Sequence, residues 1–212
     1  MGAVALTCLM LVTTSVPAQQ PDALHVAYLA LGAAKVTTLR LTGFGATYAI
    51  TPAPSSSPRE PLQSYDAEVD FVRPGMRVTL VRGTATERRP AEVLAQDAQQ
   101  IWSTPQGFLS AAHASRATTR LVPYGTEVTF ISGGRTYVGL INGRGEVDRV
   151  HTWVNNPVLG DILVETLFRD YEQTPAGVSF PMHITQSHAG RPSFDIWLSS
   201  VAVETRTKEA RP

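Results

Sequence analysis

The second half of this sequence alternates between apolar and polar residues in six successive runs. Each run has the two-residue period of a β-strand with one buried face. The breaks between them hold Gly, Pro or Asn, the residues of tight turns. In order, the runs are TEVTFIS, RTYVGLIN, GEVDRVHTWV, GDILVETLFRDYE, GVSFPMHITQ and SFDIWLSSVAVE. Because short links join neighbouring strands in antiparallel order, these runs predict one antiparallel sheet.

Three further strands are predicted earlier in the chain. Leu39 and Leu41 alternate with polar residues, and the GFG at 43–45 indicates a bend or bulge. The apolar residues of 65–71 alternate with three acids, and an RPG turn leads into the strand MRVTLVRG. Residues 51–62 and 83–100 are expected to be loop or irregular. With about nine strands and two helices, the chain is expected to be mainly β (α+β).

The three acids of the early strand are Asp66, Glu68 and Asp70. They can be interpreted as a cation site or as the solvated face of a strand, and the solvated face is the stronger interpretation. The returning strand is expected to bring Arg77 and Arg82 near them.

Two short helices are indicated. The first begins after Pro21 and Asp22 and ends at Gly32. The second has Ser103 or Thr104 as its cap and Pro105 in its first turn; it is expected to bury Phe108, Leu109 and Ala112.

The N-terminus is typical of an export signal. Residues 3–12 form an apolar run that is shorter than a membrane span. A polar stretch follows and ends in Val16-Pro17-Ala18, which places small residues where a signal peptidase cleaves. We expect a signal peptide of residues 1–18 with cleavage before Gln19; an N-terminal core helix is the alternative. The mature chain would then hold one domain, residues 19–204, and a polar tail, residues 205–212, with no transmembrane span. Its localisation would be periplasmic or extracellular. Cys8, the one cysteine, lies inside the signal, so no disulfide or cysteine nucleophile is expected.

The strongest apolar face is in the last two strands. Val178, Phe180, Met182 and Ile184 alternate along one strand, and Phe194, Ile196 and Leu198 continue the face on the next. Pro181 lies inside the first run. Because proline cannot donate a backbone hydrogen bond, it is expected at a sheet edge or a bulge.

Composition and motifs predict no chemistry of the chain's own. Eighteen basic and eighteen acidic residues give zero net charge, so no nucleic-acid partner is expected. The five histidines contain no His-x-His pair, and a metal site from His183, His188 and Asp195 is disfavoured because these side chains are not expected to converge. No nucleophile or phosphate-binding motif is present, and the acids Asp161, Glu165, Asp170 and Glu172 are not marked as an acid and base pair. We therefore expect neither a cofactor nor a catalytic residue.

Several stretches resemble known families. YEQTPAGVSFPMHITQ, RPSFDIWLSSVAVE and the RPGMR at 73–77 are similar to bacterial periplasmic lipoprotein-carrier and lipoprotein-sorting domains. LGAAKVTTLRLTGFG, IWSTPQGFLSAA and NNPVLGD resemble the N-terminal region of exported proteins whose C-terminal half is a metallo-β-lactamase-fold hydrolase. The zinc-binding His-x-His-x-Asp-His cluster of that catalytic half is absent from this sequence. The resemblance implies a strongly curved half-barrel with helices on its concave side and an apolar cavity between.

Two functions follow as hypotheses. The first is a non-catalytic exported binding domain for an apolar small molecule, an acyl chain, a lipid or a lipoprotein. The second is an accessory or substrate-recognition domain with a hydrolase partner; an enzyme acting alone ranks third. The residues expected to line the ligand site are Phe180, Met182, Ile184, Phe194, Ile196, Leu198, Phe108 and Leu109.

Overall fold

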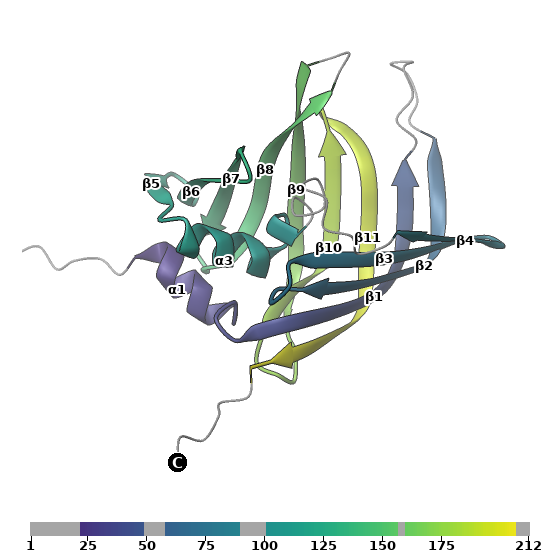
Figure 1. The fold of residues 1–212 in the computed structure, drawn as a ribbon, viewed down its shortest axis with the longest axis horizontal. Coiled ribbons are helices and arrows are strands. Elements are labelled where there is room, and N and C mark those ends of the chain that lie inside the picture. Colours follow the sequence, from purple (N-terminus) through teal and green to yellow (C-terminus); the bar gives the residue numbers. More distant parts are fainter. Residues whose placement is uncertain (1–21, 49–57, 90–100, 157–159, 207–212) are drawn as a thin grey trace, which may run out of the picture.

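The computed structural model describes residues 22–48, 58–89, 101–156 and 160–206, and these form one strongly curved antiparallel sheet (Figure 1). Eleven strands follow each other in the order β4-β3-β2-β1-β11-β10-β9-β8-β7-β6-β5, and the sheet does not close into a barrel. The strands are β1 (Val36–Tyr48), β2 (Arg59–Asp70), β3 (Gly75–Arg82), β4 (Ala85–Arg89), β5 (Thr118–Val122), β6 (Gly125–Ser132), β7 (Arg135–Asn142), β8 (Val147–Asn156), β9 (Gly160–Gln173), β10 (Ser179–His188) and β11 (Arg191–Thr205). The prediction of a mainly β fold is confirmed.

The strand count is higher than predicted. β4 lies in a segment expected to be irregular, β5 was missed, and the first residues of β2 lie in the predicted loop 51–62. These segments carry few apolar residues, so they give no period-two signal. Backbone pairing makes them strands nonetheless: β4 pairs with β3, β5 pairs with β6, and Pro61 pairs with Ala46 of β1.

The GFG sequence forms the predicted irregularity in β1. Its register with β11 shifts between Thr42 and Gly43, and its register with β2 shifts between Gly43 and Gly45. A Cβ atom at Gly43 would lie 2.3 Å from the carbonyl oxygen of Trp197, and one at Gly45 would lie 2.0 Å from that of Asp195. Only glycine therefore allows β1 to approach β11 this closely where the sheet bends.

Pro181 lies at a local edge, as its chemistry predicts. β10 pairs with β9 from Ser179 onward, but its pairing with β11 begins only at His183. Along residues 179–182, the strand therefore has a ladder partner on one side. Beyond Trp197, β11 keeps its pairing with β1 on its other edge but has no partner residue in β10.

The predicted helices are α1 (Ala23–Ala30) and α3 (Pro105–Ala114), and both lie on the concave side of the sheet (Figure 1). The side chain of Asp22 accepts a hydrogen bond from the amide of Leu24, and the side chain of Thr104 accepts one from Gly107. Pro105 occupies the first turn of α3. The predicted starts of both helices are confirmed.

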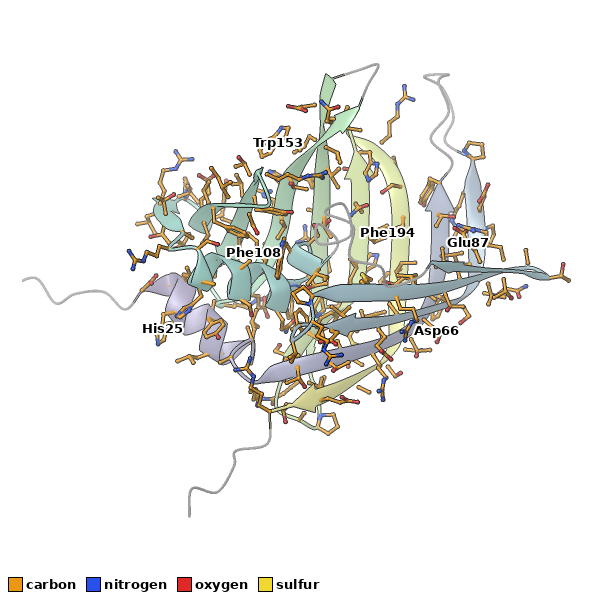
Figure 2. All side chains as sticks on the ribbon, in the orientation of Figure 1. His25, Asp66, Glu87, Phe108, Trp153 and Phe194 are labelled. Atoms are coloured by element: carbon orange, nitrogen blue, oxygen red, sulfur yellow. The ribbon has the colours of Figure 1, made fainter. Side chains whose placement is uncertain are left out.

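Phe108 of α3 fixes the helix layer to the sheet. Its ring lies on the backbone of β7 at Gly139, where a Cβ atom would come within 2.2 Å of the ring. Phe130 lies 5.3 Å from Phe108, and Tyr137 stacks on Phe130 at 5.1 Å, measured between ring centroids. Phe108 and Leu109 have no exposed surface. The helices therefore fill the concave face over β6 and β7, whereas Phe194 lies farther along that face (Figure 2).

Gln106 also joins the helices to the sheet. Its amide nitrogen donates to the carbonyl oxygens of Leu31, after α1, and Ser179 of β10, at 3.2 and 2.8 Å. The side chain is 1% exposed. The predicted signal peptide and its cleavage site lie outside the described residues, as does most of the predicted polar tail.

Filling the space beneath Phe108 tests this anchor. Gly139→Ala places a methyl group against a ring that cannot move into solvent, and we expect it to lower the free energy of unfolding by about 1–3 kcal/mol. Gly143→Ala is the matched control, because a Cβ atom there meets no atom within 4 Å. Urea denaturation measures both variants, and equal stabilities would contradict the close packing of α3 on β7.

Candidate ligand-binding cavity

A cavity of about 460 Å³ lies on the concave face, beyond the strands that α1 and α3 contact. β1, β2 and β3 supply one wall, and β9, β10 and β11 supply the other. Ser103 and Thr104, just before α3, close it on the helix side. The volume falls within the range of small-molecule sites, about 300–1,000 Å³.

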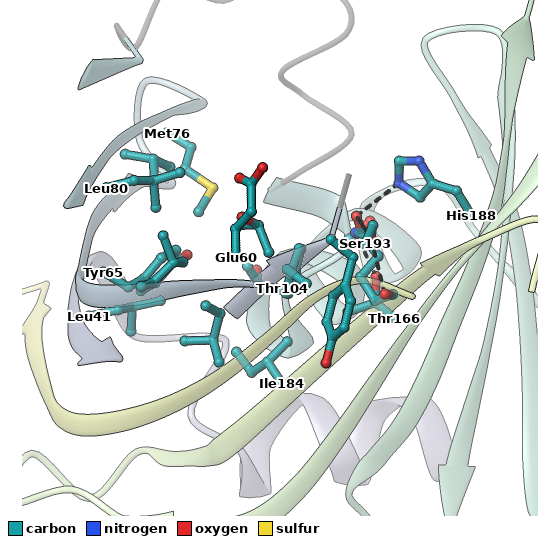
Figure 3. A pocket seen from close by; sticks show the side chains of 18 of the residues that line it. Leu41, Glu60, Tyr65, Met76, Leu80, Thr104, Thr166, Ile184, His188 and Ser193 are labelled. Atoms are coloured by element: carbon teal, nitrogen blue, oxygen red, sulfur yellow. Dashed lines mark hydrogen bonds between the residues drawn. The ribbon is translucent and has the colours of Figure 1, made fainter. Parts of the chain in front are cut away.

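Strand register builds the apolar floor of the cavity. Leu62, Gly45, Ile196, Ile184 and Phe168 are successive cross-strand partners on five neighbouring strands. All but Gly45 line the cavity. Leu41, Met76, Val78 and Leu80 extend this surface along β1 and β3, and Figure 3 shows Leu41, Met76 and Leu80 on one side of the cavity.

A second row of cross-strand partners lies nearer the β1–β2 connection and is more polar. It runs from Glu60 through Thr47, Phe194 and Gln186 to Thr166. All five residues line the cavity. The cavity thus has an apolar floor beside a polar rim.

Arg82 lies in this rim rather than among the acids of the outer face. Its guanidinium group contacts Glu60 at 3.5 Å and Glu87 at 2.5 Å, and it donates to the Thr47 hydroxyl at 3.2 Å. The sequence prediction was correct for Arg77, which pairs with Glu68 at 3.3 Å, but wrong for Arg82. The two residues are five positions apart, and strand alternation places them on opposite faces.

Gln186 organises the other polar side chains of the rim. Its amide nitrogen donates to Thr166 Oγ1 at 3.1 Å, and its Oε1 lies 3.0 Å from His188 Nε2. Ser193 Oγ donates to the backbone and side-chain oxygens of Gln186 at 3.0 and 3.3 Å. Ser193 lies at a register shift between β10 and β11, and such a bulge redirects a side chain that would otherwise face outward.

Tyr65 is a polar group in the apolar part of the cavity wall. Burial raises the pKa of its hydroxyl group well above the usual value of 10.0. The hydroxyl donates no hydrogen bond to another described residue.

The residues expected to line a ligand site fall into two groups. Ile184, Phe194 and Ile196 lie in the cavity wall. Phe180, Leu198, Phe108 and Leu109 are buried in the hydrophobic core, and Met182 is half-buried against it. Contact of any of them with a ligand stays a prediction. Sequence reasoning did not select Glu60, Arg82, Gln186 or Ser193, whose inward placement depends on strand register.

The histidines of the last hairpin lie in separate environments. His183 contacts Asp195 at 2.7 Å and stacks on Trp197, with 3.8 Å between ring centroids. His188 lies in the cavity rim. Within the described ranges, no three His, Cys, Asp or Glu side chains come close enough to hold a metal ion.

Two of the acids noted in the sequence, Glu165 and Glu68, form cross-strand pairs. Glu165 contacts His151 at 2.5 Å, and Glu68 bridges Arg40 and Arg77, each at 3.3 Å. These pairs fit a solvated strand face rather than an acid and base facing a substrate.

Comparison with known proteins finds a likeness in fold but none in sequence. No family model matches the sequence, and no curated protein matches it. One similar structure is the crystal structure of a proposed outer membrane lipoprotein-sorting protein domain from Vibrio parahaemolyticus. The alignment covers 88% of this chain and 93% of the Vibrio chain. The TM-score is 0.45 and the sequence identity is 8%, so the likeness assigns no family or function. The resemblance to hydrolase-associated regions also stays a prediction. No helix in the part of the chain that the structure describes is long and apolar enough to span a membrane.

The environment of Tyr65 predicts a pH dependence of stability. Because its pKa is raised in the folded protein, the native state binds more protons than the unfolded state above about pH 10, and stability falls as pH rises through that range. We expect Tyr65→Phe to make this loss shallower, although Tyr137 and Tyr171, whose pKa values burial also raises, retain part of it.

Urea midpoints at pH 8 and pH 10.5 measure the effect. Tyr124→Phe is the control, because this side chain is 81% exposed, and it should show the same decline as the parent. An identical decline in Tyr65→Phe and the parent would contradict the burial of Tyr65.

Proposed function

We propose that this chain is a non-catalytic, exported binding protein that holds an apolar ligand in the cavity between the two halves of its curved sheet. The observation that carries the proposal is the uneven filling of the concave face. Among the described residues, α1 and α3 cover this face over β6 and β7, whereas Leu62, Ile184 and Ile196 line the cavity. Export rests on the apolar segment at residues 3–12.

The energetics favour a hydrocarbon ligand. Each methylene group transferred from water to such a floor gains about 0.8 kcal/mol, so an acyl chain of ten or so carbons has enough surface to bind well. The ligand classes that fit are a free lipid, another acyl compound, or the acyl chain of a lipoprotein.

The rim supports binding rather than catalysis. His188 and Ser193 both form hydrogen bonds to Gln186 rather than to each other. A serine nucleophile needs a base that accepts its proton, and here the Ser193 proton goes to an amide or backbone oxygen. A role beside a hydrolase partner stays the alternative, and no contact in the cavity favours it specifically.

Filling the cavity tests the proposal. The neutral fluorescent probe N-phenyl-1-naphthylamine should bind the parent protein with a rise in fluorescence. Ile184→Trp places a bulkier ring in the cavity and should weaken probe binding by tenfold or more while the melting temperature stays near that of the parent. Ile131→Trp adds the same ring at a side chain that is 67% exposed, and it should bind the probe as the parent does.

Two results would contradict the proposal. The first is a parent protein that does not bind the probe. The second is an Ile184→Trp variant that binds normally but loses about 1–3 kcal/mol of stability, the cost of overpacking a space that was already filled.

A further inference from the structure

We infer that the ligand is a single-chain amphiphile whose head group is uncharged and donates hydrogen bonds through hydroxyl groups, as in a monoacylglycerol, rather than a fatty-acid anion. This inference rests on the proposed function and narrows its ligand class. It depends on three features of the cavity: the placement of its polar groups, the charge state of its rim, and the hydrogen-bonding capacity of that rim.

The polar groups define where the head group lies. His188, Ser193 and Thr166 gather on one side of the cavity, opposite Leu41, Met76 and Leu80 (Figure 3). An apolar chain buries most surface along β1 and β3. The head group of such a ligand therefore meets the side chains around Gln186.

The charges of the rim disfavour an anion. Arg82 is the one permanent cation among the described residues that line the cavity. Its guanidinium group is already engaged by Glu60 and Glu87, so a carboxylate head must compete with two carboxylates for it. Glu60 also lines the cavity and repels a second negative charge.

The hydrogen bonds of the rim favour a head group that donates. His188 Nε2 must carry a proton to bond Gln186 Oε1, and burial lowers the pKa of this imidazole, so Nδ1 remains an acceptor. Ser193 directs its proton to Gln186 and keeps its oxygen lone pairs. A carboxylate has no proton to offer these acceptors, whereas a hydroxyl group does.

Three twelve-carbon ligands separate these contributions. At pH 8, displacement of N-phenyl-1-naphthylamine should give 1-monolauroylglycerol a dissociation constant about tenfold lower than that of laurate. Methyl laurate, which is neutral but has no donor, should fall between them. All three are compared below their aggregation concentrations, on the same protein.

Two variants with matched controls assign the effect to the rim. Glu60→Gln should strengthen laurate binding about threefold relative to 1-monolauroylglycerol binding, because it removes the repelling charge and frees part of Arg82. Glu68→Gln is the same change on the outer face of the same strand, and it should change the affinity for neither ligand.

Ser193→Ala should weaken the binding of 1-monolauroylglycerol about fivefold, as expected for the loss of one ordinary hydrogen bond, and leave the binding of methyl laurate as it was. Ser199→Ala, at an exposed serine of the same strand, is its control.

The outcomes distinguish this inference from the proposed function. The head-group assignment would be overturned if laurate or methyl laurate bound as tightly as 1-monolauroylglycerol. Probe binding would still support the cavity as a binding site in that case. Failure of all three ligands to displace a bound probe would overturn it as well. Absence of probe binding would remove both.

Discussion

The contact between Phe108 and Gly139 determines how the interior of this protein is divided. Because β7 has no side chain at Gly139, the ring of Phe108 can lie directly on the sheet and draw α3 into the concave face. Phe130 and Tyr137 complete an aromatic cluster around it, and Gln106 ties the same helix to α1 and β10. A helix anchored at β7 cannot also cover β1–β3. The cavity is therefore a consequence of where the helices are held.

The bends of the sheet shape the half of the concave face that holds the cavity. Gly43 and Gly45 let β1 approach β11 at a register shift, and the pairing of β10 with β11 ends beside Pro181. These irregularities curve the sheet so that β2 and β3 face β9 and β10 across the cavity. The row of Leu62, Ile196, Ile184 and Phe168 thus becomes a continuous apolar floor. The polar row beside it comes from the residues two positions farther along the same five strands.

Local patterns predicted the parts of the fold that local chemistry determines. Period-two alternation found the strands of residues 126–204, Thr104 and Pro105 marked the start of α3, and the glycines at 43 and 45 marked the bulge. β4 and β5 were missed because backbone pairing, not composition, makes them strands. The rim was missed for a related reason: Glu60, Arg82 and Ser193 are far apart in sequence, and only strand register and a bulge bring them together. Ile184, Phe194 and Ile196 belong to the strongest apolar face of the sequence and line the cavity, whereas Phe180 shares that face but lies in the core.

In this protein one half of the concave face is filled by side chains, and we propose that the other half receives a ligand. Methyl NMR of the protein labelled at Ile, Leu and Val, titrated with N-phenyl-1-naphthylamine, tests it residue by residue, because the aromatic rings of the probe shift the methyl signals that they contact. We expect shifts at Leu41, Leu62, Leu80 and Ile184, with Leu109, Val128 and Val150 unchanged. Shifts confined to the second group, or to exposed methyl groups such as that of Ile131, would contradict it.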